Sequence, residues 1–178
     1  MSAAGPSENG AHLSSQNALG ELEPGASFTS AARTITETDL VSFAALTGDW
    51  HPQHSDAEWA REGHFGERVA HGMLVLSYSL GLAPMNPERV IALRGIRDVV
   101  FKRPVKIGDT IRVEGRVEHL RPLDEETGIA ELTWKVVNQS DETVVRAHLQ
   151  ALWRLEASDP AADALLSAWE APLDEVFL

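Results

Sequence analysis

At 178 residues, of which 43% are hydrophobic and 24% charged, the chain is long enough for one sizeable core and short for two domains. It contains no cysteine, which excludes disulfides, thiolate catalysis and Cys-ligated metal sites. A formal net charge of −12 argues against nucleic acid as a partner, because neutralising phosphates requires a basic face.

The composition predicts one domain between two tails. Residues 1–20 are rich in Ser, Ala, Gly and Asn without hydrophobic periodicity, which is typical of a mobile arm. A single domain is expected over 21–155, followed by an acidic, Ala-rich tail at 156–178 with a short helix around 161–169. The N-terminus has no basic or apolar signal region, and the longest apolar run is too short to cross a bilayer. We therefore expect a cytoplasmic protein without a membrane segment.

The first half of the domain is predicted to hold a strand at 26–35 and then two helices. Thr36, with Asp39 three residues later, resembles a capping box that starts a helix running to about Thr47, where Gly48 ends it. Ser55 and Glu58 repeat the capping signal for a short helix over 56–62. Asp49 therefore leaves from a firmly held helix end.

Residues 72–83 are apolar nearly all round, which predicts a helix enclosed on most sides, ended by Pro84 and Pro87. The remaining segments alternate between apolar and polar residues, as in half-buried antiparallel strands. Such strands are expected within 99–105, 111–119, 130–136 and 145–153, with hairpin links at 106–109 and 138–142. We predict an α+β fold in which a curved antiparallel sheet wraps the apolar helix. Open sheet edges further predict a homodimer.

Asp49 and His54 are the strongest candidates for catalysis. They lie five residues apart in a polar turn that Pro52 stiffens, so both could face one cavity. A carboxylate and an imidazole that share a water can divide proton transfer between them. Two other interpretations stay open at this point. Asp49 could simply brace the turn, with His54 an ordinary loop residue, or the pair could bind a metal together with His51, His64 and His71.

Two further features bear on ligand binding. Gly72 opens the apolar helix, where unpaired backbone N–H groups suit an oxyanion, although a glycine there could equally serve tight packing. Between 94 and 106 the charge becomes locally basic, which predicts either a solvated strand face or a phosphate cradle. The cations are Arg94, Arg97, Lys102, Arg103 and Lys106, against Asp98 alone.

Three stretches resemble the MaoC-like dehydratases, a family that includes (R)-specific enoyl-CoA hydratases with the hot-dog fold. TGDWHPQHSDAEWA is similar to the hydratase signature, VAHGMLVLSYSLGL to the start of the central helix, and FKRPVKIGDTIRV to the strand and turn that follow. The resemblance covers about 20–155. His51 departs from it, because many members have Asn at that position.

The resemblance implies a hot-dog homodimer that reversibly hydrates trans-2-enoyl-CoA, or a related thioester, to the (R)-3-hydroxyacyl thioester, without metal or cofactor beyond the acyl carrier. Asp49 and His54 would be the acid/base pair, and the Gly72 amide would polarise the thioester carbonyl. Substrate contacts are expected from His51, His71, Met73, Arg94, Arg97, Lys102 and Arg103. A hot-dog acyl-CoA thioesterase and a non-catalytic acyl-thioester-binding subunit remain alternatives.

Overall fold

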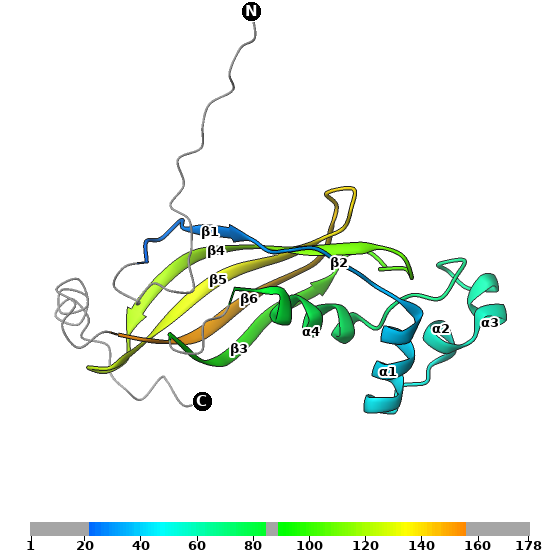
Figure 1. Cartoon of the computed structure of the whole chain (residues 1–178), viewed down its shortest axis with the longest axis horizontal. Helices are drawn as coiled ribbons and strands as arrows, with labels where there is room; N and C mark the ends of the chain where they lie inside the picture. Colours follow the sequence, from blue (N-terminus) through cyan, green and yellow to red (C-terminus); the bar gives the residue numbers. More distant parts are fainter. Residues whose placement is uncertain (1–21, 85–88, 156–178) are drawn as a thin grey trace, which may run out of the picture.

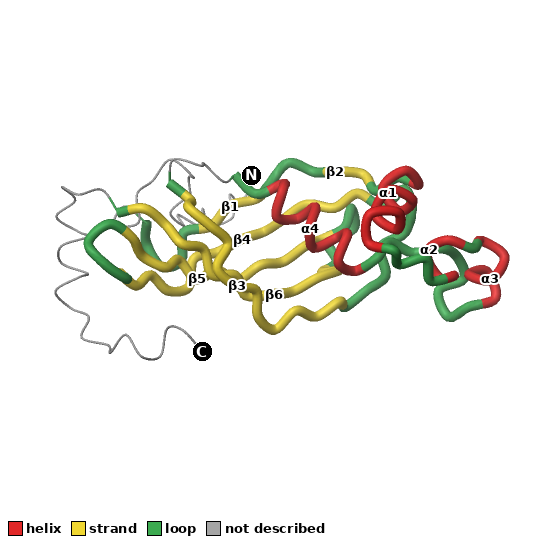
Figure 2. The backbone as a smooth tube through the Cα atoms, turned by 90° about the horizontal axis from the view of Figure 1, so that it is seen from below, coloured by secondary structure: helices red, strands yellow, loops and turns green. Residues whose placement is uncertain are grey.

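A curved antiparallel sheet forms the body of the protein in the computed structural model, which describes residues 22–84 and 89–155 (Figure 1). The predicted N-terminal arm and the helix expected around 161–169 lie outside these residues. Helix α4 crosses one face of the sheet, and α1, α2 and α3 gather at one end (Figures 1 and 2). The predicted α+β architecture is confirmed.

The sheet follows the order β1-β4-β5-β6-β3, with β2 also pairing with β4, and every pairing is antiparallel. The strands are β1 Ser27–Thr29, β2 Arg33–Thr34, β3 Val90–Phe101, β4 Thr110–Pro122, β5 Thr127–Val137 and β6 Thr143–Arg154.

Two strand predictions were wrong. The strand expected over 26–35 is broken into β1 and β2, and the one expected within 99–105 is β3, which begins at Val90 and ends at Phe101. Because β3 pairs with β6 at the edge of the sheet, the turn at 106–109 does not join neighbouring strands. The link at 138–142 does form the expected hairpin, with Asp141 in the left-handed region at φ 61°.

The alternation predicted in β4 holds as far as Val117 and then fails. Ile111, Val113, Gly115 and Val117 are buried, but His119 is exposed. The pairing with β5 shifts register between Val117 and His119, and such a bulge reverses the face of the residues beyond it.

Helix α1, Glu37–Thr47, begins and ends as predicted. Thr36 and Asp39 form both hydrogen bonds of a capping box, and Gly48 closes the helix in the left-handed conformation at φ 77°. Asp39 also accepts hydrogen bonds from Arg33 and from Tyr78 of α4. Burial acts to raise the pKa of Asp39, but these bonds outweigh it and hold that pKa at about 2. The start of α1 is thereby tied to α4.

The following segment contains one more helix than expected. A single turn, α2 Pro52–Ser55, precedes α3 Ala57–Glu62. The cap of α3 is Asp56, whose carboxylate accepts from the amides of Glu58 and Trp59, so the prediction that Ser55 caps this helix was wrong. The Ser55 hydroxyl instead donates to backbone carbonyls of the preceding turn.

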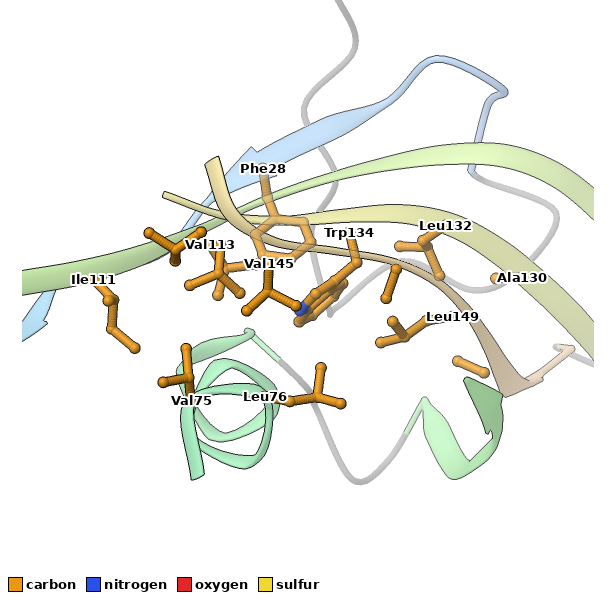
Figure 3. Packing of buried hydrophobic residues seen from close by; sticks show 14 of the residues in the cluster. Phe28, Val75, Leu76, Ile111, Val113, Ala130, Leu132, Trp134, Val145 and Leu149 are labelled. Atoms are coloured by element: carbon orange, nitrogen blue, oxygen red, sulfur yellow. The ribbon is translucent and has the colours of Figure 1, made fainter. Parts of the chain in front are cut away.

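Helix α4, Gly72–Leu82, packs its buried side against the sheet, where Val75 and Leu76 point towards the core residues of the strands (Figure 3). The buried Trp134 indole donates a 2.9 Å hydrogen bond to the Ser79 hydroxyl, which fixes the helix on β5. Met73 is nevertheless 54% exposed. The other exposed positions, Ser77 and Gly81, lie on the same stripe as Met73, so the helix is enclosed on most sides, as its composition predicted. No helix among the described residues is long and apolar enough to cross a membrane.

Candidate active site

A cavity of about 510 Å³ lies where the end of α1, the start of α4 and the end of β3 meet. Asp49, His54, His71, Gly72 and Met73, which the sequence singled out, all line it. Its walls are mostly apolar, and they include Phe43, Phe65, Val69, Val75, Phe101 and Val145. The polar turn with Asp49 and His54 and the start of α4 with Gly72, which are separate in the sequence, therefore share one cavity.

The turn after α1 presents the Asp49 carboxylate. Because Gly48 adopts the left-handed conformation, the chain reverses there and leaves Asp49 exposed at the cavity. The Asp49 amide donates to the Thr47 hydroxyl at 3.3 Å, and its carboxylate accepts from the His51 amide at 3.2 Å. The carboxylate is thus oriented by the backbone of its own turn while it remains open to solvent or substrate.

His54 has a defined tautomer. Its Nδ1 lies 2.7 Å from the Val69 carbonyl oxygen. A carbonyl only accepts, so Nδ1 carries the proton in the neutral ring, and Nε2 holds a free lone pair. Burial is the main cause that lowers the pKa of His54 below its ordinary value; the nearby His71 and His51 act in the same direction, whereas Val69 and Asp49 oppose it. His54 is therefore suited to accept a proton near neutral pH.

His71 lies beneath this pair and is only 3% exposed. Its ring stacks on that of His54 with 3.8 Å between centroids and 28° between planes. Its Nε2 lies 3.0 Å from the Asp49 backbone carbonyl. His71 was expected to contact substrate; in the structure it lines the cavity and contacts both Asp49 and His54.

One ligand atom from each of Asp49, His54 and His71 can be chosen so that all lie within 4.8 Å of one another, which is close enough to consider a metal. An imidazole binds a metal through its in-plane lone pair. The His54 and His71 rings are stacked 3.8 Å apart, so their in-plane lone pairs do not point at a common metal position. One ring would have to turn before both could bind the same ion. The geometry fits proton transfer better than metal binding.

Gly72 begins α4 next to Phe101 at the end of β3. A Cβ built on Gly72 would lie 2.8 Å from the Phe101 ring, so this glycine makes room for the ring in the cavity wall. Gly72 thus permits close packing, and it also lies in the first turn of α4, where backbone amides are unpaired.

We expect Gly72→Ala to lower turnover about tenfold, because the new methyl group displaces the Phe101 ring from the cavity wall. The loss should be much smaller when Gly72→Ala is introduced into a Phe101→Ala background, which removes the clash. Initial rates of the four proteins in this double-mutant cycle measure the coupling. Equal losses in both backgrounds would show that the clash with Phe101 is not the cause.

His51, the departure from the resemblance, does not line the cavity. Its Nδ1 accepts a hydrogen bond from the Gln53 amide at 3.1 Å, which makes it the N-cap of α2. An Asn side-chain oxygen can make the same bond. His51 thus replaces the more common residue in a capping role, and its expected contact with substrate stays a prediction.

The basic residues expected to hold phosphates divide into two groups. Lys102 and Arg103 line the cavity, whereas Arg94 and Arg97 on β3 do not. Lys106 does not line it either, and its ammonium is 2.6 Å from Glu67. Arg97 is 3.7 Å from Glu131 and Arg103 is 3.2 Å from Glu142. Among the described residues, the Lys102 ammonium has no hydrogen-bonding or ionic partner, which leaves it available to an anionic ligand.

Several cavity residues were not foreseen. Phe43, Phe65 and Phe101 carry no local pattern that distinguishes a cavity wall from an ordinary core position. The Val69 carbonyl, which sets the His54 tautomer, belongs to the backbone and has no sequence signal of its own.

The chain belongs to the MaoC-like domain family, whose model matches residues 21–138. It is 43% identical over 113 residues to protein MaoC of Klebsiella aerogenes, which covers 59% of this chain and 33% of that protein. It is 36% identical over 96 residues to an (R)-specific enoyl-CoA hydratase of Rhodospirillum rubrum, which covers 52% of this chain and 65% of that one. The chain thus spans less than two thirds of the length of these curated relatives.

Solved structures agree with this assignment. A monoamine oxidase regulatory protein of Archaeoglobus fulgidus matches with a TM-score of 0.74 and 38% identity, over 81% of this chain and 99% of that one. A Mycobacterium tuberculosis protein with a double hot-dog fold matches with a TM-score of 0.71 over 89% of this chain and 47% of that one. At 19% identity the second likeness concerns the fold alone. The predicted hot-dog fold is confirmed.

Proposed function

We propose that this protein catalyses the reversible hydration of a trans-2-enoyl thioester to the (R)-3-hydroxyacyl thioester, with no cofactor beyond the acyl carrier. The observation that carries the proposal is the convergence of Asp49, His54 and the first turn of α4 on one largely apolar cavity. The likeness to an enzyme named (R)-specific enoyl-CoA hydratase supports it.

The geometry divides the chemistry between these groups. The acid/base pair consists of the free Nε2 of neutral His54 and the Asp49 carboxylate. Water adds to C3 of the enoyl group while its proton passes to this pair. The electrons of the double bond move onto the thioester oxygen as an enolate, and a proton returned by the pair to C2 completes the product. Atoms and charge balance without another reactant.

The enolate oxygen requires hydrogen-bond donors at the moment when its charge develops. We assign this role to the backbone amide of Gly72, which lies at the positive end of the α4 dipole. Removal of one such donor in other enzymes costs about 10² to 10³ in rate. Because the donor belongs to the backbone, side-chain substitutions at Gly72 test the fit of the cavity and not the loss of the amide itself.

The rate of hydration should depend on pH through His54. Neutral His54 is the active form, so kcat/KM should stay constant above the pKa of His54 and fall as the pH drops through it. Because burial in particular lowers that pKa, the midpoint of the fall should lie below 6.5, the ordinary histidine value. A pH profile with crotonyl-CoA measures it. A midpoint above 6.5 would show that His54 is not the group that must be unprotonated.

For the carrier we propose CoA, and its phosphates would contact the Lys102 ammonium at the cavity, which is unpaired within 22–84 and 89–155. A net charge of −12 would tend to repel an acidic carrier protein. Comparison of kcat/KM for crotonyl-CoA and the corresponding pantetheine thioester tests this assignment: Lys102→Gln should weaken use of the CoA ester and leave the pantetheine ester unaffected.

We also propose that the protein is a homodimer that pairs through β3. This twelve-residue strand lies at the edge of the sheet, and Ile91, Leu93, Val100 and Phe101 on it are large apolar residues that remain exposed. A long apolar edge with open backbone groups is normally covered by another chain. Because Phe101 also lines the cavity, a second copy at this edge would lie next to the site.

Light scattering on the full chain should therefore give the mass of two chains, and Ile91→Glu should shift the mass towards one chain by placing a charge in the interface. Leu46→Glu is the control, because Leu46 is 83% exposed and belongs to α1, not to β3. A single-chain mass for the unmodified protein would contradict the proposed dimer.

Turnover of enoyl-CoAs of increasing acyl length tests the proposed activity directly and defines its range. Hydration is seen as loss of enoyl absorbance without release of free thiol. Release of free thiol with the enoyl absorbance intact would instead indicate a thioesterase, and tight binding without any turnover would indicate a non-catalytic acyl-thioester-binding subunit.

A further inference from the structure

His71 connects the two residues assigned to proton transfer, yet its own chemistry is not used in the reaction above. We propose that His71 is a positioning residue, which holds the His54 ring by stacking and holds the Asp49 backbone through a hydrogen bond. This inference rests on the proposed function, because it concerns how the same site is kept in its working geometry.

The first contact is between rings. His71 is the residue before α4, and α4 is fixed to the sheet through Ser79 and Trp134. Its ring also contacts Phe43 of α1, with 5.0 Å between centroids. Stacking on His71 therefore transfers the rigidity of the core to the His54 ring, which belongs to a single helical turn and is otherwise held by its hydrogen bond to the Val69 carbonyl.

The second contact is a hydrogen bond. The Asp49 carbonyl can only accept, so at 3.0 Å it must receive the proton on His71 Nε2. This bond joins positions 22 residues apart and holds the turn on which the Asp49 carboxylate is displayed. One imidazole thus constrains both members of the acid/base pair.

The other ring nitrogen of His71, Nδ1, destabilises the fold in this arrangement. With the proton on Nε2, His71 Nδ1 is a buried acceptor, and it has no hydrogen-bond partner among the described residues. An unpaired buried acceptor destabilises a fold, and this side chain makes no capping bond to α4 that would offset the loss. A phenylalanine would avoid the penalty, so the histidine is better explained by the bond that Nε2 makes.

Three substitutions separate the contacts. His71→Phe keeps a ring under His54 but has no donor, His71→Gln keeps a donor near the position of Nε2 but has no ring, and His71→Ala removes both. We expect His71→Phe to have a Tm equal to or above that of the unmodified protein, yet a kcat about 10- to 100-fold lower with KM little changed. His71→Gln should retain part of the kcat that His71→Ala loses.

Nitrogen chemical shifts of His54 provide a readout that does not require turnover. In the unmodified protein they should report one neutral tautomer, with the proton on Nδ1 facing the Val69 carbonyl. In His71→Ala the ring loses the stack that holds it at this carbonyl, so the shifts should move towards the average of two tautomers. If the unmodified protein does not hydrate enoyl thioesters, the proposed function fails, and these shifts still decide whether His71 positions His54.

Three results would overturn the proposal. The first is a full kcat in His71→Phe. The second is a parallel loss of Tm and kcat in all three variants, which would make the role of His71 purely structural. The third is unchanged nitrogen chemical shifts of His54 in His71→Ala.

Discussion

Asp49→Asn should reduce hydration of crotonyl-CoA by at least about 10², with the fold and Tm unchanged. The substitution keeps the size of the side chain and an oxygen that can accept from the His51 amide, so the turn should persist. It removes the carboxylate that exchanges a proton with water or C2. Asp49 is exposed and has no ionic partner among the described residues, so no buried charge is left uncompensated.

Asp56→Asn is the matched control for this prediction. Asp56 lies seven residues further along, outside the cavity, and caps α3 through its side-chain oxygen, a role that Asn fills equally well. The Asp56→Asn variant should hydrate crotonyl-CoA at the rate of the unmodified protein. Undiminished turnover in Asp49→Asn would remove Asp49 from the mechanism.

His54→Gln should lower kcat by about 10² to 10⁴, the range that a positioned acid/base group contributes. The glutamine amide can still donate to the Val69 carbonyl, so the local hydrogen bond that holds the side chain can be kept. What disappears is the basic lone pair on Nε2. The acid limb of the pH profile should disappear with it, because the residual activity no longer depends on an imidazole in this position.

His51→Asn controls for a histidine replaced in the same turn. Asn can accept from the Gln53 amide as His51 does, so α2 remains capped and the rate should change little. A loss in His51→Asn as large as that in His54→Gln would mean that the turn as a whole, and not the His54 base, carries the activity.

The parts of the site that the sequence predicted are those held by local chemistry. The capping box of α1, the left-handed Gly48 and the stiff Pro52 act over a few residues, so they place the turn with Asp49 and His54 without knowledge of the rest of the fold. The Gly72 helix start was likewise visible, because a glycine followed by an apolar run marks the beginning of α4.

The parts that were missed depend on contacts between distant segments. Strand β3 lies at an edge with much of its surface exposed, so it lacks the alternation that identifies a half-buried strand, and its start at Val90 could not be read. The basic stretch looked unopposed in sequence, yet Glu131 and Glu142 from β5 and the β5–β6 hairpin lie beside Arg97 and Arg103. The stack of His54 on His71 likewise has no signal in spacing.

The apolar character of α4 was a sound guide to its burial. Its composition predicted a helix enclosed on most sides, and only Met73, Ser77 and Gly81, on one stripe, are exposed. Met73 lines the cavity, whereas the exposed apolar edge of β3, which the proposed second copy would cover, had no signal in the composition.

The most direct test of the central proposal is the product formed from crotonyl-CoA by the purified full chain, with Asp49→Asn run in parallel. We expect (R)-3-hydroxybutyryl-CoA, formed as the enoyl absorbance is lost, without release of free thiol and at a rate that falls at least about 10² in the variant. The (S) product, release of free CoA from an intact enoyl group, or equal rates in the two proteins would contradict it.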